Sequence, residues 1–194
     1  NMSLGSSDHI STDCSSMNPS MASMVAQMKA ANIATIAASG NYGGNTGVSF
    51  PACIGDIVNV AATDKSDNVA SFSQLGANLD LGAPGVSIYS SVPVSTYAYE
   101  SGTSMAAPHV AGAWAVMRQS APTASFQQIY NAFVNTSVLR TRASDGGTVR
   151  RINLAAAYSS LQPQKPTGLY VTGSLTTAPV RPTYHWTHDN VATW

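Results

Sequence analysis

Hydrophobic and polar positions alternate along the first 160 residues between strand-like and helix-like patterns. Short runs of apolar and β-branched residues, bounded by glycine, proline or polar turns, predict strands. They lie at NMSL (1–4), NIATIAA (32–38), DIVNVAA (56–62), LDLGAPGVSIYSSV (79–92, interrupted at Pro84-Gly85) and TYAYE (96–100). Because these runs alternate with helical segments, the pattern predicts an α/β fold, doubly wound around a mostly parallel sheet.

Four segments have the pattern of helices. Residues 19–32 carry Pro19 near the start, where its missing N–H does no harm, and apolar residues on one face. The segment from Ser104 is apolar nearly all round, which predicts a buried rather than an amphipathic helix. Residues 125–135 and 153–161 predict a surface helix and a short last helix.

The character of the chain changes at Gln162. Residues 162–167 are rich in proline and predict a linker. Residues 168–194 contain the short β-patterned pieces GLYVTGS and PTYHW, which predict the beginning of a β-sandwich module of the fibronectin-III or immunoglobulin kind. Both chain ends fall within strand-like patterns, so we expect the sequence to be a fragment of a longer protein.

Charge excludes several classes of partner. Only 9% of the 194 residues are charged, and nine basic residues offset nine acidic ones. A nucleic-acid or acidic-membrane partner would require net positive charge, so neither is expected. No apolar run of 18 residues or more occurs, so no membrane span is predicted. The one basic cluster, Arg140, Arg142, Arg150 and Arg151 around SDGG, is interpreted as a solvated loop with its flanks.

The stretch SGTSMAAPHVAG (101–112) places a serine where a strand gives way to a helix. The first N–H groups of a helix lack intrahelical partners and point at whatever lies in front of them. His109 is five positions from Ser104, so a helix turns it away by roughly 140° and displaces it by about 7.5 Å. A base for Ser104 must therefore come from another segment. The glycine-rich loop SGNYGGN (39–45) also follows a strand, and ligands gather at such carboxyl ends.

The two cysteines, Cys14 and Cys53, are 39 positions apart, with no CxxC pattern and no histidine at ligand spacing. A metal site built on them is not expected. A disulfide and two free thiols both remain open at this point.

The motif GTSMAAPHVAG (102–112) resembles the nucleophile motif of the subtilisin-like serine proteases, the subtilases. Four further blocks agree in order: NMSLG (1–5), AASGNYG (37–43), ASFSQLGANLDLGAPGVSIYSS (70–91) and RINLAAA (151–157). The resemblance covers about residues 1–160. It implies the C-terminal half of a subtilase catalytic domain, residues 1–161, whose N-terminal half would be a required partner.

The resemblance implies the roles of the site residues. Ser104 would be the nucleophile, and the side-chain amide of Asn41 would stabilise the oxyanion together with the Ser104 N–H. Segments Ser3-Leu4-Gly5 and Ala38-Ser39-Gly40 would bind a polypeptide substrate and wall the pocket for the residue before the cut. Ser49 would lie at the base of that pocket. None of these residues is acidic, so large neutral side chains are the expected preference.

Two further features are implied by the same resemblance. Cys14 falls in the loop after Ser3-Leu4-Gly5, Cys53 falls in the loop that matches the base of the pocket, and the two are expected to form a disulfide. The carbonyls of Gly55 and Ile57 with the Asp80 carboxylate match a calcium site of proteinase K and its relatives, and oxygen ligands suit Ca²⁺. No cofactor is expected for the chemistry itself.

One departure from the family matters more. The aspartate and histidine motifs that precede the NMSLG block in subtilases do not occur here, and His9, His185 and His188 are interpreted as bystanders. The chain alone is therefore expected to be inactive, although its parent would be a secreted serine endopeptidase. A pseudoprotease kept for binding is the alternative. An α/β-hydrolase-type esterase is disfavoured by the missing final glycine of its elbow, and a sedolisin-like peptidase is disfavoured by Asn41.

Overall fold

The computed structural model describes residues 1–94, 96–162, 167–172 and 183–187. The chain divides into two units, Asn1–Leu161 and Gln162–Trp194. In the second unit, β8 (Thr167–Thr172) and β9 (Thr183–Thr187) pair in antiparallel fashion. The predicted linker falls mostly outside the described residues, and a β-sandwich at 168–194 stays a prediction.

A five-stranded sheet forms the centre of the first unit, in the order β1-β2-β3-β7-β6. Its strands are β1 (Ile36–Ala38), β2 (Val58–Thr63), β3 (Leu81–Pro84), β6 (Val138–Thr141) and β7 (Thr148–Arg151). The first four in spatial order are parallel, and only β6 runs antiparallel to its neighbour. The mostly parallel sheet predicted from the alternating pattern is confirmed. Every residue of β2 is buried, as expected for a strand covered on both faces.

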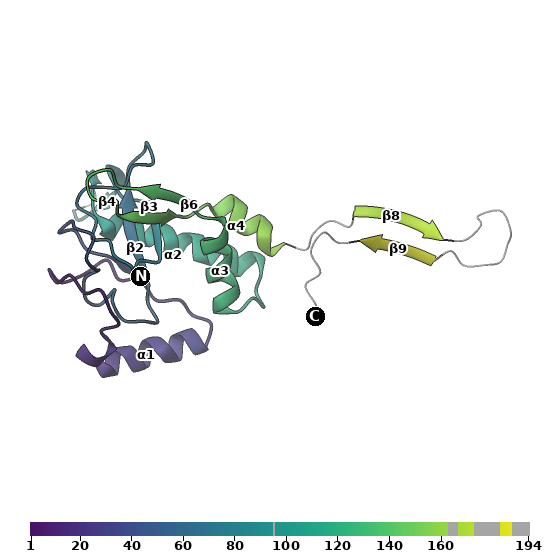
Figure 1. Ribbon diagram of the computed structural model, residues 1–194, viewed down its shortest axis with the longest axis horizontal. Coiled ribbons are helices and arrows are strands. Elements are labelled where there is room, and N and C mark those ends of the chain that lie inside the picture. The colour runs from purple at the N-terminus through teal and green to yellow at the C-terminus, as the bar shows by residue number, and fades with distance from the viewer. Residues whose placement is uncertain (95, 163–166, 173–182, 188–194) are drawn as a thin grey trace. The chain divides into compact units, whose positions relative to one another are not determined.

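Two apolar layers cover the sheet because successive strand residues point to opposite faces. Ile36 and Ala38 of β1 pack in a cluster with α2 (Thr103–Ser120) and α3 (Phe126–Thr136). Ala37, between them, packs in the other cluster, to which α1 (Pro19–Ala30) contributes Val25. The helices α2, α3 and α4 (Leu154–Leu161) gather together, whereas α1 lies apart from them (Figure 1).

The remaining elements are short. A 3-10 turn, η1 (Ser15–Met17), precedes α1, and the hairpin of β4 (Ile88–Val92) and β5 (Thr96–Glu100) leads into α2. Next to η1, Cys14 and Cys53 form a disulfide with their Cα atoms 5.4 Å apart, as the resemblance implied. Both cysteines are buried. The disulfide therefore ties the segment after residues 3–5 to the loop that follows Ser49.

The predicted strand at NMSL is wrong beyond a single bridge. Met2 pairs in parallel with Ala37, where its N–H donates to Ile36 O at 2.8 Å and its carbonyl accepts from Ala38 N at 3.1 Å. The next residue leaves the sheet, because the Ser3 hydroxyl donates to the Ser104 carbonyl at 2.7 Å. The strand pattern ends where the chain turns toward the helix.

Helix α2 also differs from its prediction of burial all round. Its buried residues follow helical spacing on one face: Thr103, Ala106, Ala107, Val110, Ala113, Trp114 and Met117. The opposite face is exposed at Pro108, His109, Gly112, Ala115 and Val116. Apart from His109 and Gln119, this exposed face is built of small and apolar residues, so composition alone did not indicate it.

The basic cluster is only partly a solvated loop: residues 143–146 and Arg150 are exposed, whereas the interpretation is wrong for Arg142. Arg142 is only 5% exposed and forms an ion pair with Asp145 at 2.6 Å. Arg140 and Arg151 both bind Asp67, at 2.7 and 2.6 Å. These arginines hold the β6–β7 hairpin against loops that are distant in sequence.

Candidate active site

Ser104 is the second residue of α2, at the end where the helix presents unpaired N–H groups. Its hydroxyl donates weakly to the Ser3 carbonyl at 3.4 Å, while the Ser3 hydroxyl donates to the Ser104 carbonyl at 2.7 Å. This reciprocal contact places residues 3–5 beside the N-terminus of α2. Ser104 itself is partly exposed, so its hydroxyl is accessible.

Asn41 follows β1 and reaches the same helix end. Its Oδ1 accepts hydrogen bonds from the Thr103 N–H and the Thr103 hydroxyl, each at 2.9 Å. With Oδ1 occupied in this way, the amide orientation is fixed by its hydrogen bonds. No acceptor in the described part of the chain takes a hydrogen bond from Nδ2, which is therefore available as a donor. A Cβ on Gly102 would stand 3.3 Å from Nδ2, so glycine keeps this side of the amide open.

A hollow of about 250 Å³ lies in front of these residues. It is lined by Leu4, Gly5, Ser6, Ala38, Gly40, Asn41, Tyr42, Thr103 and Ser104. Six of these were expected at the site; Ser6, Tyr42 and Thr103 were not. The position of Thr103 immediately before the serine was the available signal, and Tyr42 follows Asn41 on the same loop.

Ser39 and Ser49 lie beneath the hollow instead of lining it, since both are fully buried. A Cβ on Gly5 would overlap the Ser49 hydroxyl, and a Cβ on Gly40 would overlap the side chain of Gln74. At Gly5 and Gly40 the hollow is therefore bordered by backbone atoms, and these pack against buried polar side chains. Gly40 also has a φ of 115°, a conformation that favours glycine.

No histidine in the described side chains contacts Ser104. The ring Nδ1 of His109 lies 2.8 Å from the Met105 carbonyl, within the same helix. Because a carbonyl only accepts, Nδ1 is the protonated nitrogen in this contact. His9 is exposed and lies near Gly44. His188 falls outside the described residues, as does the side chain of His185.

The proposed calcium ligand Asp80 is engaged in another network. Its Oδ2 accepts from the Asn59 N–H at 3.0 Å and its Oδ1 accepts from the Tyr130 hydroxyl at 2.6 Å. Burial raises the pKa of the Asp80 carboxyl, although both hydrogen bonds oppose this shift. Burial and the neighbouring Asp80 carboxylate raise the pKa of Tyr130. Among the residues the structure describes, no cluster of three or more His, Cys, Asp or Glu is arranged to hold a metal ion.

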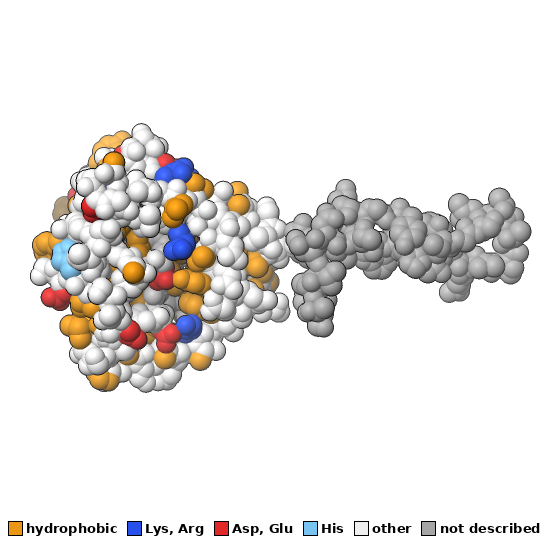
Figure 2. Space-filling model, viewed as in Figure 1, with side chains coloured by type: hydrophobic (Ala, Val, Ile, Leu, Met, Phe, Trp, Pro, Cys, Tyr) orange, Lys and Arg blue, Asp and Glu red, His pale blue; other side chains and the backbone are white. Residues whose placement is uncertain are grey.

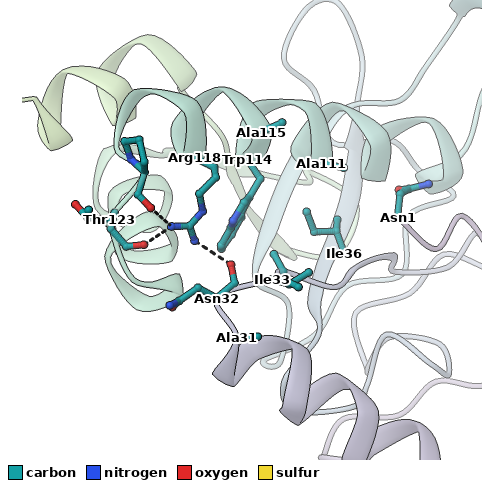
Figure 3. A pocket seen from close by; sticks show the side chains of 13 residues that line it. Asn1, Ala31, Asn32, Ile33, Ile36, Ala111, Trp114, Ala115, Arg118 and Thr123 are labelled. Atoms are coloured by element: carbon teal, nitrogen blue, oxygen red, sulfur yellow. Dashed lines mark hydrogen bonds between the residues drawn. The ribbon is translucent and has the colours of Figure 1, made fainter.

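A larger hollow of about 760 Å³ lies elsewhere, between the end of α1, the middle of α2 and residues 122–124 (Figure 3). Arg118 borders it and donates to the carbonyls of Asn32, Pro122 and Ala124. Neither Ser104 nor Asn41 lines this hollow. The Arg118 guanidinium is bound to backbone, so the hollow offers no reactive group.

The surface agrees with the low charge of the sequence. Charged side chains are sparse and scattered on the face shown in Figure 2, among hydrophobic and uncharged polar ones. Among the described helices, none combines the length and the apolar character needed to cross a membrane.

The chain is similar in sequence to one family of known proteins. The sequence model of the family described as "Subtilase family" matches residues 1–169. Alkaline elastase YaB from Bacillus sp. (strain YaB) is 47% identical over 138 residues, which are 71% of this chain and 34% of that protein. Subtilisin Savinase from Lederbergia lenta is 50% identical over 105 residues, which are 54% of this chain and 39% of that protein. Thermitase from Thermoactinomyces vulgaris is 42% identical over 127 residues, covering 66% and 43%. The chain thus spans less than half the length of each of these relatives.

Two solved structures share the fold. The prenylagaramide maturation protease PagA superposes with a TM-score of 0.72 at 24% identity, over 84% of this chain and 62% of its own. At that identity the likeness speaks for the fold alone. A protease from Pseudoalteromonas arctica superposes with a TM-score of 0.67 at 31% identity, over 82% of this chain and 50% of its own.

Proposed function

The chain belongs to the subtilase family, and we propose that the protein containing it is a serine endopeptidase whose nucleophile is Ser104. One observation carries the proposal. The Ser104 hydroxyl, the N-terminus of α2 and the free Nδ2 of Asn41 border the same hollow, and Thr103 fixes the Asn41 amide.

In the proposed reaction, the Ser104 Oγ bonds to the carbonyl carbon of a peptide, and the carbonyl oxygen becomes an anion. Asn41 Nδ2 and the Ser104 N–H donate to that oxygen. The peptide C–N bond then breaks, the amine leaves with a proton from the base, and water releases the acyl group. An uncharged amide suits this role because it faces negative charge without titrating.

The base is proposed to come from outside this sequence. A serine hydroxyl needs an adjacent base to take its proton, and no described histidine reaches Ser104. We therefore expect a histidine and its aspartate from another part of the catalytic domain. Residues 1–194 alone should retain only the contribution of the oxyanion donors and substrate binding, about 10³–10⁴ over water.

Substrate binding is proposed along residues 3–5 and 38–40. Within the described part of the chain, the backbone groups of Leu4 and Gly5 make no hydrogen bond, so an extended peptide can pair with them. The hollow carries no charged lining residue. Its uncharged walls support a preference for large neutral side chains before the cut.

A structural calcium ion at Gly55, Ile57 and Asp80 stays a prediction. Both Asp80 oxygens already accept one hydrogen bond, so an ion would have to share the carboxylate with Asn59 and Tyr130. Calcium that raises the melting temperature of the wild type and not of Asp80→Ala supports the site. If calcium changes the melting temperature of neither protein, the proposed calcium site is ruled out.

The location is proposed to be extracellular. Disulfides persist in oxidising compartments and are rare in the cytosol, and the structure contains the Cys14–Cys53 disulfide.

The test uses the full-length protein, its Ser104→Ala variant, a fluorophosphonate probe and a panel of fluorogenic peptides. Serine-dependent labelling and cleavage after large neutral residues are expected. Cleavage mainly after Arg or Lys would overturn the specificity. Peptide binding without any Ser104-dependent cleavage would instead identify a pseudoprotease.

A further inference from the structure

Arg142 is a buried arginine at the end of β6, and its guanidinium binds two loops at once. Nη2 donates to the Gly44 carbonyl and Nη1 to the Ser73 carbonyl, both at 2.6 Å. Longer contacts of 3.3 Å join Nη1 to the carbonyls of Ala70 and Ser71. A buried charge is costly unless it is hydrogen-bonded, so a guanidinium that uses all of its nitrogens as donors is expected at this site.

Asp145 completes the arrangement from the same hairpin. Its two oxygens accept from Arg142 Nε at 2.9 Å and Nη2 at 2.6 Å, a bidentate pair. The hydrogen bond from Arg142 is the main cause of the lowered pKa of the Asp145 carboxyl, with a smaller contribution from the Gly147 N–H. Asp145, three residues further along the same turn, therefore neutralises the charge of Arg142.

The two loops that Arg142 joins are also bonded to each other around Asn41. Gly43 N donates to Phe72 O at 2.7 Å, Gln74 N to Gly40 O at 3.0 Å and Leu75 N to Gly44 O at 3.1 Å. Gly43 and Gly44 have positive φ values of 69° and 81°. Two consecutive glycines leave the backbone conformationally free. The position of this loop therefore depends on its contacts with other elements.

Asn41 lies between Gly40 and Gly44, and both of these residues are also held by side chains of other elements. On one side Gly40 N donates to the Thr103 hydroxyl at 3.2 Å, and on the other the Gly44 carbonyl is held by Arg142. Oxyanion stabilisation depends on donors that are in place before charge develops. Neither Arg142 nor Asp145 lines the hollow, so any effect on the reaction must pass through the loop.

We propose that Arg142, with Asp145 as its counter-ion, is a positioning residue that holds the Asn41 loop for oxyanion stabilisation. The inference rests on the proposed function, since it assigns a support to the same site. Lysine cannot replace this arginine, because an ammonium lacks the planar fork that reaches several carbonyls and a carboxylate together.

The kinetic test compares Arg142→Lys with Arg140→Lys in the full-length protein. Arg140 is on the same hairpin, and its guanidinium binds Asp67 and the Leu139 carbonyl instead of the Asn41 loop. We expect Arg142→Lys to lower kcat about tenfold with KM within about twofold, the pattern of a lost transition-state interaction. Arg140→Lys should change neither value by more than about twofold.

A double-mutant cycle with Asn41→Ala separates positioning from general structural damage. Once the amide is absent, Arg142→Lys should lower kcat by less than about twofold, because its effect passes through that amide. An equal loss in both backgrounds, or an unchanged kcat for Arg142→Lys, overturns the inference. If Arg142→Lys does not fold, Asp145→Asn replaces it, with an expected loss of about threefold and the same dependence on Asn41.

Hydrogen exchange provides a readout that does not need activity. In Ser104→Ala protein, Arg142→Lys should speed exchange of the Gly43 amide, whereas Arg140→Lys should not. Unchanged Gly43 exchange would refute the positioning role, even if the protein with Ser104 intact cleaves peptides. If Gly43 exchanges faster in Arg142→Lys but the protein with Ser104 intact shows no Ser104-dependent cleavage, the positioning role of Arg142 is supported and the proposed function is refuted.

Discussion

Thr103 holds the Asn41 side chain by two hydrogen bonds of 2.9 Å, one from its N–H and one from its hydroxyl. The Thr103 hydroxyl also accepts from the Gly40 N–H. A fully buried residue that was not expected at the site thus connects the nucleophile helix to both the side chain of the oxyanion donor and the backbone before it.

Replacing Thr103 with valine should lower kcat about fivefold with little change in KM. Valine keeps the shape but removes one hydrogen bond to Oδ1, worth about 1 kcal/mol, and leaves Gly40 N–H without its acceptor. Steady-state kinetics on a neutral peptide provide the measurement. Thr103→Ser retains the hydroxyl and should keep most of the activity. A valine variant with the wild-type kcat would show that the hydroxyl does not orient Asn41.

Removing the disulfide should destabilise the protein strongly. Cys14 and Cys53 are separated by 39 positions, and closing a loop of that length in the unfolded chain corresponds to about 4 kcal/mol. The double variant Cys14→Ala/Cys53→Ala should show this loss in urea unfolding of the full-length protein. Adding a reductant should bring the wild type to the same midpoint and leave the variant unchanged. A variant as stable as the oxidised wild type would contradict the prediction.

Asp67 should stabilise the protein at neutral pH and cease to do so in acid. A hydrogen bond from Arg151, and then one from Arg140, lowers the pKa of its carboxyl below the ordinary 3.8. For an acid with a depressed folded pKa, the stabilisation is present above the unfolded pKa and is lost as pH falls through the folded pKa. Asp67→Asn should therefore reduce the urea midpoint at pH 7 and reduce it less at pH 2.

Asparagine suits this position because Asp67 has a φ of 66°, which asparagine adopts readily. Asp8→Asn is the matched control, since the Asp8 carboxylate has no ion pair in the described part of the chain. A loss for Asp67→Asn that is the same at both pH values would disprove the ionic origin.

Tyr130→Phe should also destabilise more at neutral pH, although the pKa of the carboxyl involved, Asp80, is shifted in the opposite direction. Burial raises the pKa of Asp80 above 3.8, so its contribution to stability is lost as pH rises from 3.8 through the folded pKa. Removing the Tyr130 hydroxyl takes away a donor to the charged form and raises that pKa further. We expect a loss of roughly 1–3 kcal/mol in unfolding free energy, larger at pH 7 than at pH 4.

The exposed Tyr158 of α4 provides a control at which the same substitution should change little. If Tyr130→Phe is less destabilising at pH 7 than at pH 4, Asp80 is not the group responsible.

The sequence predicted the features that depend on local pattern. Strand β2 and the helix that begins near Ser104 were predictable because their apolar runs are long and sharply bounded. The Asn41 loop could be placed at the site in advance because it follows a strand of a parallel sheet. Ser104 was placed there by its motif, since the strand before it, β5, belongs to a separate antiparallel hairpin.

What could not be predicted depends on partners distant in the chain. Arg142 stands beside SDGG, which has the composition of a solvated turn, and carbonyls about 70 residues away decide its burial. The exposed side of α2 was missed because alanine and glycine are common on both faces of such a helix. Residues 3–5 leave the sheet through a contact with Ser104, 101 positions away, which no local pattern encodes.

The bond from Arg142 to Gly44 also bears on the timing of biosynthesis. It joins residues 98 positions apart, and a ribosome releases the chain from the N-terminus onward. The loop that carries Asn41 therefore leaves the ribosome long before the arginine that supports it. During translation the loop is held only by its nearer neighbours, and its last anchor is added after the β6–β7 hairpin has emerged.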